Sequence, residues 1–226
     1  MTTRSKRYKN SSKPNFEELE LPKAIETLSS FDKVKFDETV EISMSLGVDP
    51  KQTSQAVRGV VNLPHGSGKE IKVLVFTESP EEAIQMGADF AGLEDLISKI
   101  KDGWMDFDVA LSTTSAMKTV RSIARVLGPR GLMPTPKAGT VTDDIQNALN
   151  EVKAGRVEFK MDKTGAIAVM IGKRSFSDEQ LQENAKTAID AISSSRPEGF
   201  KGKFIKSIFV SSTMSPSVRI ALASAN

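Results

Sequence analysis

Alternating apolar and polar residues near both ends of the chain limit the folds that it can adopt. In the stretch 36–46 every second residue from position 40 is apolar, namely Val40, Ile42, Met44 and Leu46. The stretches 157–161 and 167–171 alternate in the same way and are joined by Asp162–Gly165. Because side chains alternate between the two faces of a strand, this pattern predicts half-exposed strands, with the later pair forming a hairpin.

The other elements expected near the ends have the same mixed character. Pro22 suits a first helical turn, and the apolar residues after it predict a helix to about Ser30. We also expect a strand over Val57–Leu63 that stops at the breakers Pro64–Gly68, a helix over 178–193 and a long strand over 204–214. The polar, basic tail up to Pro14 is expected to be a disordered, solvated arm that could contact phosphates.

The middle of the chain has a different pattern. Ile71–Phe76 is a nearly continuous apolar run, and it is followed by Ser79-Pro80-Glu81-Glu82, a typical helix start in which Ser79 can cap. The unit recurs as a helix over 93–100, a strand over 107–111 and a helix over 115–127. A last helix is expected from Thr142 to Gly155, with Asp143 and Asp144 in its first turn. Alternating strands and helices predict a small parallel sheet covered on both faces.

This change of pattern predicts two domains and a mixed fold class. Residues 1–67 and 160–226 are expected to form one α+β domain of sheet and helices, split between the two ends of the chain. Residues 68–159 are expected to form an inserted three-layer α/β/α domain with a parallel sheet.

Composition excludes several classes of function. The chain has no cysteine and one histidine, which rules out disulfides, zinc ribbons and multi-histidine metal sites, so no cofactor or metal is expected. The net charge of +2 divides into +1 for 1–67, −3 for 68–159 and +4 for 160–226, so basic residues gather in the terminal domain. No apolar run approaches the roughly 20 residues of a membrane span, and no signal-peptide core follows the basic start, so we expect a cytoplasmic protein.

Two motifs that suggest catalysis do not fit it. PHGSGKE at Pro64–Glu70 lacks the spacing and the hydroxyl residue of a phosphate-binding loop, and a strand rather than a helix is expected after it. His65 has no assignable nucleophile and is interpreted as a hydrogen-bonding loop residue. Asp143 and Asp144 suit the positive end of a helix better than a magnesium site.

The most unusual segment is 126–140, with the sequence VLGPRGLMPTPKAGT. Composition alone leaves two interpretations open, a rigid connection set by its prolines or a basic surface for phosphates. The longer stretch IARVLGPRGLMPTPKAG, however, resembles the signature of the L-one family of large-subunit ribosomal proteins. Further similarity to that family lies at Lys35–Thr39, Arg58–Lys69, Lys160–Gly165 and Ser211–Pro216.

The resemblance implies that the protein binds large-subunit ribosomal RNA at the mobile lateral stalk. It also implies repression of the protein's own messenger RNA and assistance in releasing deacylated transfer RNA from the exit site. The RNA-binding residues implied are Lys35, Phe36, Thr39, Glu41, Asp162, Lys163, Thr164, Ser211, Thr213, Met214 and Ser215. Candidates for a secondary contact with transfer RNA are Arg121, Arg125, Arg130 and Lys137. Small hydroxyl side chains on a rigid sheet suit the shape-based recognition of folded RNA.

One position departs from the family pattern. Ser215 stands where the family usually has glycine. If that glycine needs a positive φ, the serine should cost roughly 1 kcal/mol, whereas if it needs only space the hydroxyl could gain a hydrogen bond.

Two other classes of function remain as alternatives. An enzyme could use the α/β insert to bind a nucleotide or another small molecule, since such sheets commonly bind ligands at their strand ends. A DNA-binding or RNA-remodelling module would instead need a dominant basic patch. Nothing in the sequence supports a homo-oligomer, so a monomer within the 50S subunit is expected.

Overall fold

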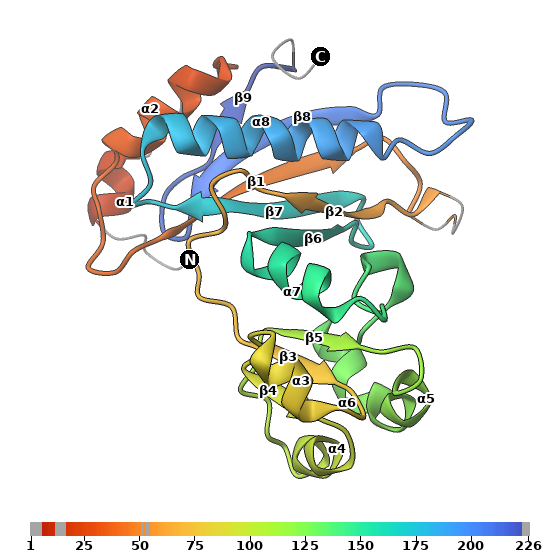
Figure 1. Cartoon of the computed structure of the whole chain (residues 1–226). Coiled ribbons are helices and arrows are strands. Elements are labelled where there is room, and N and C mark those ends of the chain that lie inside the picture. The colour runs from red at the N-terminus through yellow and green to blue at the C-terminus, as the bar shows by residue number, and fades with distance from the viewer. Residues whose placement is uncertain (1–5, 12–16, 51, 53–54, 223–226) are drawn as a thin grey trace. The chain divides into compact units, whose positions relative to one another are not determined.

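The computed structural model describes residues 6–11, 17–50, 52 and 55–222, and it divides into two compact units (Figure 1). The terminal unit consists of Met1–Gly68 with Gly155–Asn226, and the insert is Lys69–Ala154. The second crossing thus falls at Gly155 rather than at residue 160 as predicted. The reason is that β6 (Arg156–Lys160) pairs with β2 (Arg58–Asn62) of the terminal unit.

The terminal unit is built on a four-stranded antiparallel sheet with the order β7-β1-β8-β9. Its further elements, beside β2 and β6, are α1 (Lys6–Ser11), α2 (Leu21–Ser30), β1 (Thr39–Leu46), β7 (Ala166–Lys173), α8 (Asp178–Ser194), β8 (Ile205–Ser212) and β9 (Val218–Ile220).

Helices α2 and α8 contact each other and lie on the same face of this sheet (Figure 1). The predicted alternation is confirmed in β1, where Val40, Ile42, Met44 and Leu46 are buried. They join one apolar core with the inner sides of both helices and with β2 and β6. A capping box of Ser177 and Gln180 starts α8 and satisfies backbone N–H groups that the helix leaves open.

The predicted hairpin between 157–161 and 167–171 is wrong. The first stretch pairs with β2 and the second with β1, so the two strands belong to different sheets. The carboxylate of Asp162 accepts hydrogen bonds from the backbone N–H groups of Thr164 and Ala166, at 2.7 and 2.9 Å, and closes the turn between them. Alternation specifies which face of a strand is apolar but not which strand is its partner.

The predicted disordered arm is also partly wrong, because Lys6–Ser11 forms α1. The guanidinium of Arg7 donates hydrogen bonds to the backbone oxygens of Asp32 and Met214, and these contacts hold the helix against the sheet domain. The remainder of that tail, residues 1–5 and 12–14, lies outside the described ranges.

The insert is the predicted three-layer α/β/α arrangement on a parallel sheet with the order β4-β3-β5. Its elements are β3 (Val73–Phe76), α3 (Pro80–Gln85), β4 (Phe90–Gly92), α4 (Glu94–Lys101), β5 (Val109–Ser112), α5 (Met117–Val120), η2 (Arg121–Ile123), α6 (Ala124–Leu127), η3 (Gly128–Arg130), η4 (Pro136–Ala138) and α7 (Ile145–Lys153).

All four residues of β3 are buried. Leu74 and Phe76 belong to one core cluster with residues of α4 and α6, and Val73 and Val75 to another with residues of α3 and α7. The central strand therefore has apolar cover on both faces, which explains its continuous apolar sequence.

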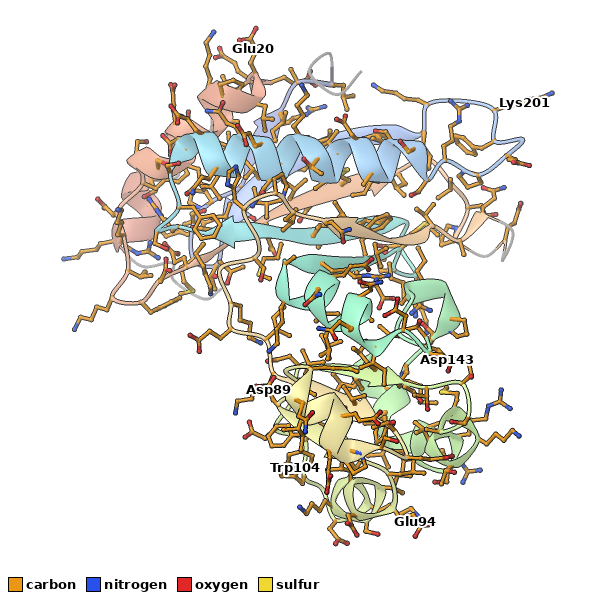
Figure 2. The ribbon with its side chains drawn as sticks, in the orientation of Figure 1. Glu20, Asp89, Glu94, Trp104, Asp143 and Lys201 are labelled. Carbon is orange, nitrogen blue, oxygen red and sulfur yellow. The ribbon has the colours of Figure 1, made fainter. Side chains whose placement is uncertain are left out.

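Three details of the insert differ from expectation. The helix predicted over 115–127 is broken into α5, η2 and α6 near Ile123, whose φ and ψ are −103° and 9°. Ser79 precedes α3 without a capping bond from its side chain. The last helix begins at Ile145, so Asp143 and Asp144 precede it. Asp144 caps it by accepting the N–H of Asn147, while Asp143 (Figure 2) accepts hydrogen bonds from Thr114.

Two glycines meet where the chain leaves and re-enters the terminal unit. The N–H of Leu63 donates to the oxygen of Gly155 at 3.3 Å, and a Cβ added at Gly155 would lie 2.4 Å from the Cα of Gly66. Gly155 also has a φ of +105°, which side chains disfavour. Only glycine lets the two segments approach this closely.

We expect Gly155→Ala to destabilise the protein by about 3 kcal/mol, from positive-φ strain of about 1 kcal/mol plus overpacking against backbone. Gly103→Ala is the matched control, because Gly103 has a φ of +101° but no described atom within 4 Å of an added Cβ. It should lose only about 1 kcal/mol. Calorimetric melting of both variants measures the difference, and equal losses would contradict the close-packing account.

Candidate nucleic-acid interface

The face of the sheet opposite α2 and α8 carries several small and polar side chains, with Met170 and Phe209 among them. Across it, Glu41 pairs with Ser211 on one side and Met170 on the other, and Ser43 pairs with Phe209 and Ala168. These side chains are half-exposed or exposed, in contrast to the buried residues between them. We call this surface the open face. A flat or grooved partner can approach it closely at Ser43, Ala168 and Ser211, where the side chains are small.

At one end of the open face, β1 and the segment after β8 are joined by threonines. The N–H of Thr213 donates to the oxygen of Thr39 at 3.1 Å, and the N–H of Thr39 donates to the hydroxyl of Thr213 at 3.2 Å. The ammonium group of Lys173, at the end of β7, donates to the Thr39 hydroxyl at 2.9 Å. The sequence analysis did not identify Lys173 as a site residue. The pairing of β1 with β7 places it opposite Thr39.

Two large apolar side chains stand exposed at this same end. Phe36 is 54% exposed and Met214 is 50% exposed. Phe36 precedes Thr39 by three residues, and Met214 directly follows Thr213. Lys35 beside Phe36 is exposed as well. Exposed apolar groups of this size rimmed by polar ones are typical of binding sites. We call Phe36, Thr39, Lys173, Thr213 and Met214 the loop-end cluster.

A buried ion pair beneath the surface holds the backbone of the loop-end cluster in place. The side chains of Glu38 and Arg174 are 1% and 6% exposed, and Nη1 of Arg174 lies 3.0 Å from Oε2 of Glu38. Oε1 of Glu38 accepts the N–H of Met214 at 2.9 Å. Nη2 of Arg174 donates to backbone oxygens at the end of α2, those of Leu28 and Phe31 among them.

The sequence analysis missed this pair although a signal for it exists. Glu38 precedes Val40, Ile42 and Met44 by the same two-residue step, which places its carboxylate on the buried face of the strand. A buried charge needs a partner, so a cation had to be present in the fold beside it.

The conformation of Ser215 shows whether serine is strained at the position where the family usually has glycine. No described residue other than glycine has a positive φ, so Ser215 carries no such strain. Its hydroxyl accepts the N–H of Ser212 at 2.9 Å and donates to the oxygen of Pro216 at 2.9 Å. The serine therefore tightens the turn after β8 through hydrogen bonds that glycine does not make.

The remaining predicted RNA-binding residues lie at the other end of the sheet. The turn that contains Asp162, Lys163 and Thr164 adjoins the end of β1, because the N–H of Leu46 donates to the oxygen of Gly165. Six residues of strand separate that end from Thr39, which corresponds to about 20 Å. The structure thus brings Glu41 and Ser211 toward the loop-end cluster and leaves the turn apart from it.

The candidates for a secondary contact all belong to the insert. Arg121, Arg125 and Arg130 are exposed on η2, α6 and η3. Lys137 lies in η4, and its side chain is outside the described set. The proline-rich segment 126–140 adopts short helical turns and exposes Arg130, while Arg121 and Arg125 precede it.

The motifs that suggested catalysis have structural roles. His65 contacts Glu183 of α8 through Nε2, and its N–H donates to the buried Asn184, so the linker is anchored to the helix. Lys69 pairs with Asp108 in front of a strand, which is not the arrangement of a phosphate-binding loop. Among the residues with described positions, three or more His, Asp or Glu side chains nowhere gather as metal ligands. Within the same ranges no helix is long and apolar enough to span a membrane.

A half-covered sheet with exposed apolar groups at one end is typical of proteins that bind a macromolecular surface. Comparisons with known proteins identify the family to which the chain belongs. The model of the Ribosomal protein L1p/L10e family matches residues 28–216. The chain is 52% identical over 210 residues to "Large ribosomal subunit protein uL1" of Persephonella marina, which covers 90% of this chain and 87% of that protein. The protein of the same name from Kosmotoga olearia is 47% identical over 97% of both chains.

The chain therefore belongs to the L1p/L10e family of ribosomal proteins, and the resemblance seen in the sequence is confirmed. It is a structural protein and not an enzyme, which removes the ligand-binding enzyme from the alternatives.

The buried pair yields a test of stability. Arg174→Met should destabilise the protein by about 3–5 kcal/mol, because it leaves the carboxylate of Glu38 buried without its cation. Arg219→Met is the control, since Arg219 and Glu18 form an ion pair with side chains 39% and 43% exposed, worth about 0–1 kcal/mol. Denaturant unfolding distinguishes them. A loss for Arg174→Met no larger than that of the control would refute the structural role of the pair.

The turn at Asp162 yields a test with pH. The carboxylate of Asp162 accepts hydrogen bonds from the N–H of Ala166, which has the larger effect, and from the hydroxyl of Thr164. These bonds lower the pKa of Asp162 below its ordinary value. Because the folded pKa is depressed, the turn gains stability above the ordinary carboxyl pKa and loses it as pH falls through the folded pKa. NMR titration should show this low midpoint, and Thr164→Val should raise it partway. An ordinary midpoint in the unmodified protein would be inconsistent with the observed turn.

Proposed function

We propose that the loop-end cluster and the open face bind a folded segment of large-subunit ribosomal RNA at the mobile lateral stalk. The observation that carries this proposal is the exposure of Phe36 and Met214 beside a rigid pair of hydrogen-bonded threonines. Support comes also from the family, whose curated relatives are named as proteins of the large ribosomal subunit.

The chemistry of the cluster suits structured RNA. Such RNA is recognised mainly through its shape, its 2′-hydroxyls and its phosphates, with apolar or aromatic side chains packing on sugars and bases. Phe36 and Met214 would supply the apolar contacts, while Lys35 and Lys173 would contact phosphates. Thr39, Ser211 and Thr213 would offer hydroxyls held in fixed positions by the sheet.

The open face extends this surface toward the far turn. Ser43 and Ala168 let a sugar-phosphate backbone approach between the two ends, and Glu41 would accept hydrogen bonds from 2′-hydroxyls or base amino groups. Lys163 would meet a phosphate about 20 Å from Thr39. An RNA segment that contacts both ends must therefore span most of the length of β1.

We propose two further roles, one for the loop-end cluster and one for the insert. A messenger RNA with a similar fold would compete for the loop-end cluster, which would let the free protein repress its own synthesis. The exposed Arg121, Arg125 and Arg130 would give the insert contact with the phosphates of exit-site transfer RNA and assist its release.

Each unit has its own apolar core, and we propose that the two fold as separate domains.

The test is binding to a stalk-type ribosomal RNA fragment and to an unrelated hairpin of equal length, at moderate and high salt. Thr213→Val and Met214→Ala should each weaken binding of the stalk fragment by more than tenfold, and the preference for that fragment should persist at high salt. Met86→Ala is the matched control, because Met86 is an exposed methionine of the insert and should leave affinity unchanged.

The contrary outcome is equally specific. If the variants bind the stalk fragment as the unmodified protein does, and affinity for both RNAs fades together with salt, the site is wrong. Only nonspecific attraction of phosphates would then remain.

A further inference from the structure

The N-terminal helix contacts the loop-end cluster through the side chain of Arg7. Arg7 of α1 is half-buried, and its Nη2 donates to the backbone oxygen of Met214 at 2.9 Å. Its Nη1 donates to the backbone oxygen of Asp32 at 3.0 Å. The planar guanidinium thereby bridges two chain segments that are far apart in sequence.

The two bridged segments are those that present the exposed apolar groups. Asp32 lies in the connection between α2 and β1, four residues before Phe36, and Met214 lies in the turn after β8. Arg7 thus ties the segment that carries one apolar group to the residue that carries the other.

The peptide groups of Met214 are held on both sides. Its N–H donates to the buried carboxylate of Glu38, and its oxygen accepts the bond from Arg7. With both backbone groups fixed, the direction in which the half-exposed side chain leaves the turn is fixed too. Removing Arg7 would free one of these two anchors while leaving the buried ion pair of Glu38 and Arg174 intact.

We infer that Arg7 is a positioning residue for RNA recognition, which acts by holding Met214 and the Asp32 segment in their binding geometry. This inference rests on the proposed RNA site. It makes α1 a part of that site, although the basic N-terminal sequence by itself suggests only a loose arm for phosphates. A fixed cluster binds more tightly than a mobile one because less conformational entropy is lost on binding.

Direct attraction of phosphate is the competing explanation, and α1 contains its own control. Lys6 is exposed on the same helix and has the same charge as Arg7. Replacing either residue by glutamine removes one positive charge, but only Arg7→Gln removes the two bonds to Asp32 and Met214. Arg7→Lys keeps the charge and loses the fork that reaches two oxygens.

The experiment measures affinity for the stalk-type fragment with the full chain carrying Arg7→Gln, Arg7→Lys, Lys6→Gln, Met214→Ala and the double change Arg7→Gln with Met214→Ala. We expect both Arg7 variants to bind about tenfold more weakly, because the released segments lose more conformational entropy when they bind. That loss should persist at high salt, and Lys6→Gln should cost less than about twofold. The double variant should lose less affinity than the two single losses combined, because part of the effect of Arg7 passes through Met214.

Other results would overturn the inference. Full affinity in Arg7→Lys, or a loss in Arg7→Gln that equals that of Lys6→Gln and fades with salt, would assign Arg7 a charge effect only. Strictly additive losses in the double variant would show that it acts independently of Met214. If Met214→Ala weakens binding and Arg7→Gln does not, the inference alone fails. If neither does, the proposed RNA site fails with it. Melting temperatures near that of the unmodified protein would show that each variant is folded.

Discussion

The carboxylate of Glu38 and the guanidinium of Arg174 meet inside the terminal unit, and the geometry of the binding surface depends on that contact. The pair joins the start of β1 to the end of β7, and through Arg174 it also holds the last carbonyl groups of α2. The second oxygen of Glu38 reaches the backbone of Met214. Four segments from distant parts of the sequence are therefore fixed by two charged groups, which are retained in the core because each neutralises the charge of the other.

Around this contact, one face of the sheet supplies stability and the other supplies function. The inner face is apolar and packs on α2 and α8, so the strands are held without help from the open face. Small residues such as Ser43 and Ala168 can then occupy the open face at little cost to stability. This division also explains a net charge of only +2 in a protein that we propose binds RNA, since shape and hydroxyl contacts replace a dense basic patch.

Much of the fold follows from sequence periodicity, and the exceptions have physical causes. The alternation in β1 and the continuous apolar run of β3 identify a half-exposed and a buried strand because burial dictates those patterns. The separation of β6 from β7 was not predictable, since pairing depends on the whole unit. Within the site, Phe36 and Met214 were found through family similarity. Arg7 was missed because its partners are distant in sequence, and such contacts leave no local pattern.

The central claim, that RNA binds the loop-end cluster and the open face, is tested most directly by mapping the bound surface with backbone NMR on the full chain. Addition of the stalk-type RNA should shift or broaden the amide signals of Thr39, Glu41, Ser211, Thr213 and Met214, while those of α8 stay in place. Perturbation confined to the insert, or spread evenly over exposed lysines of both units, would contradict the account.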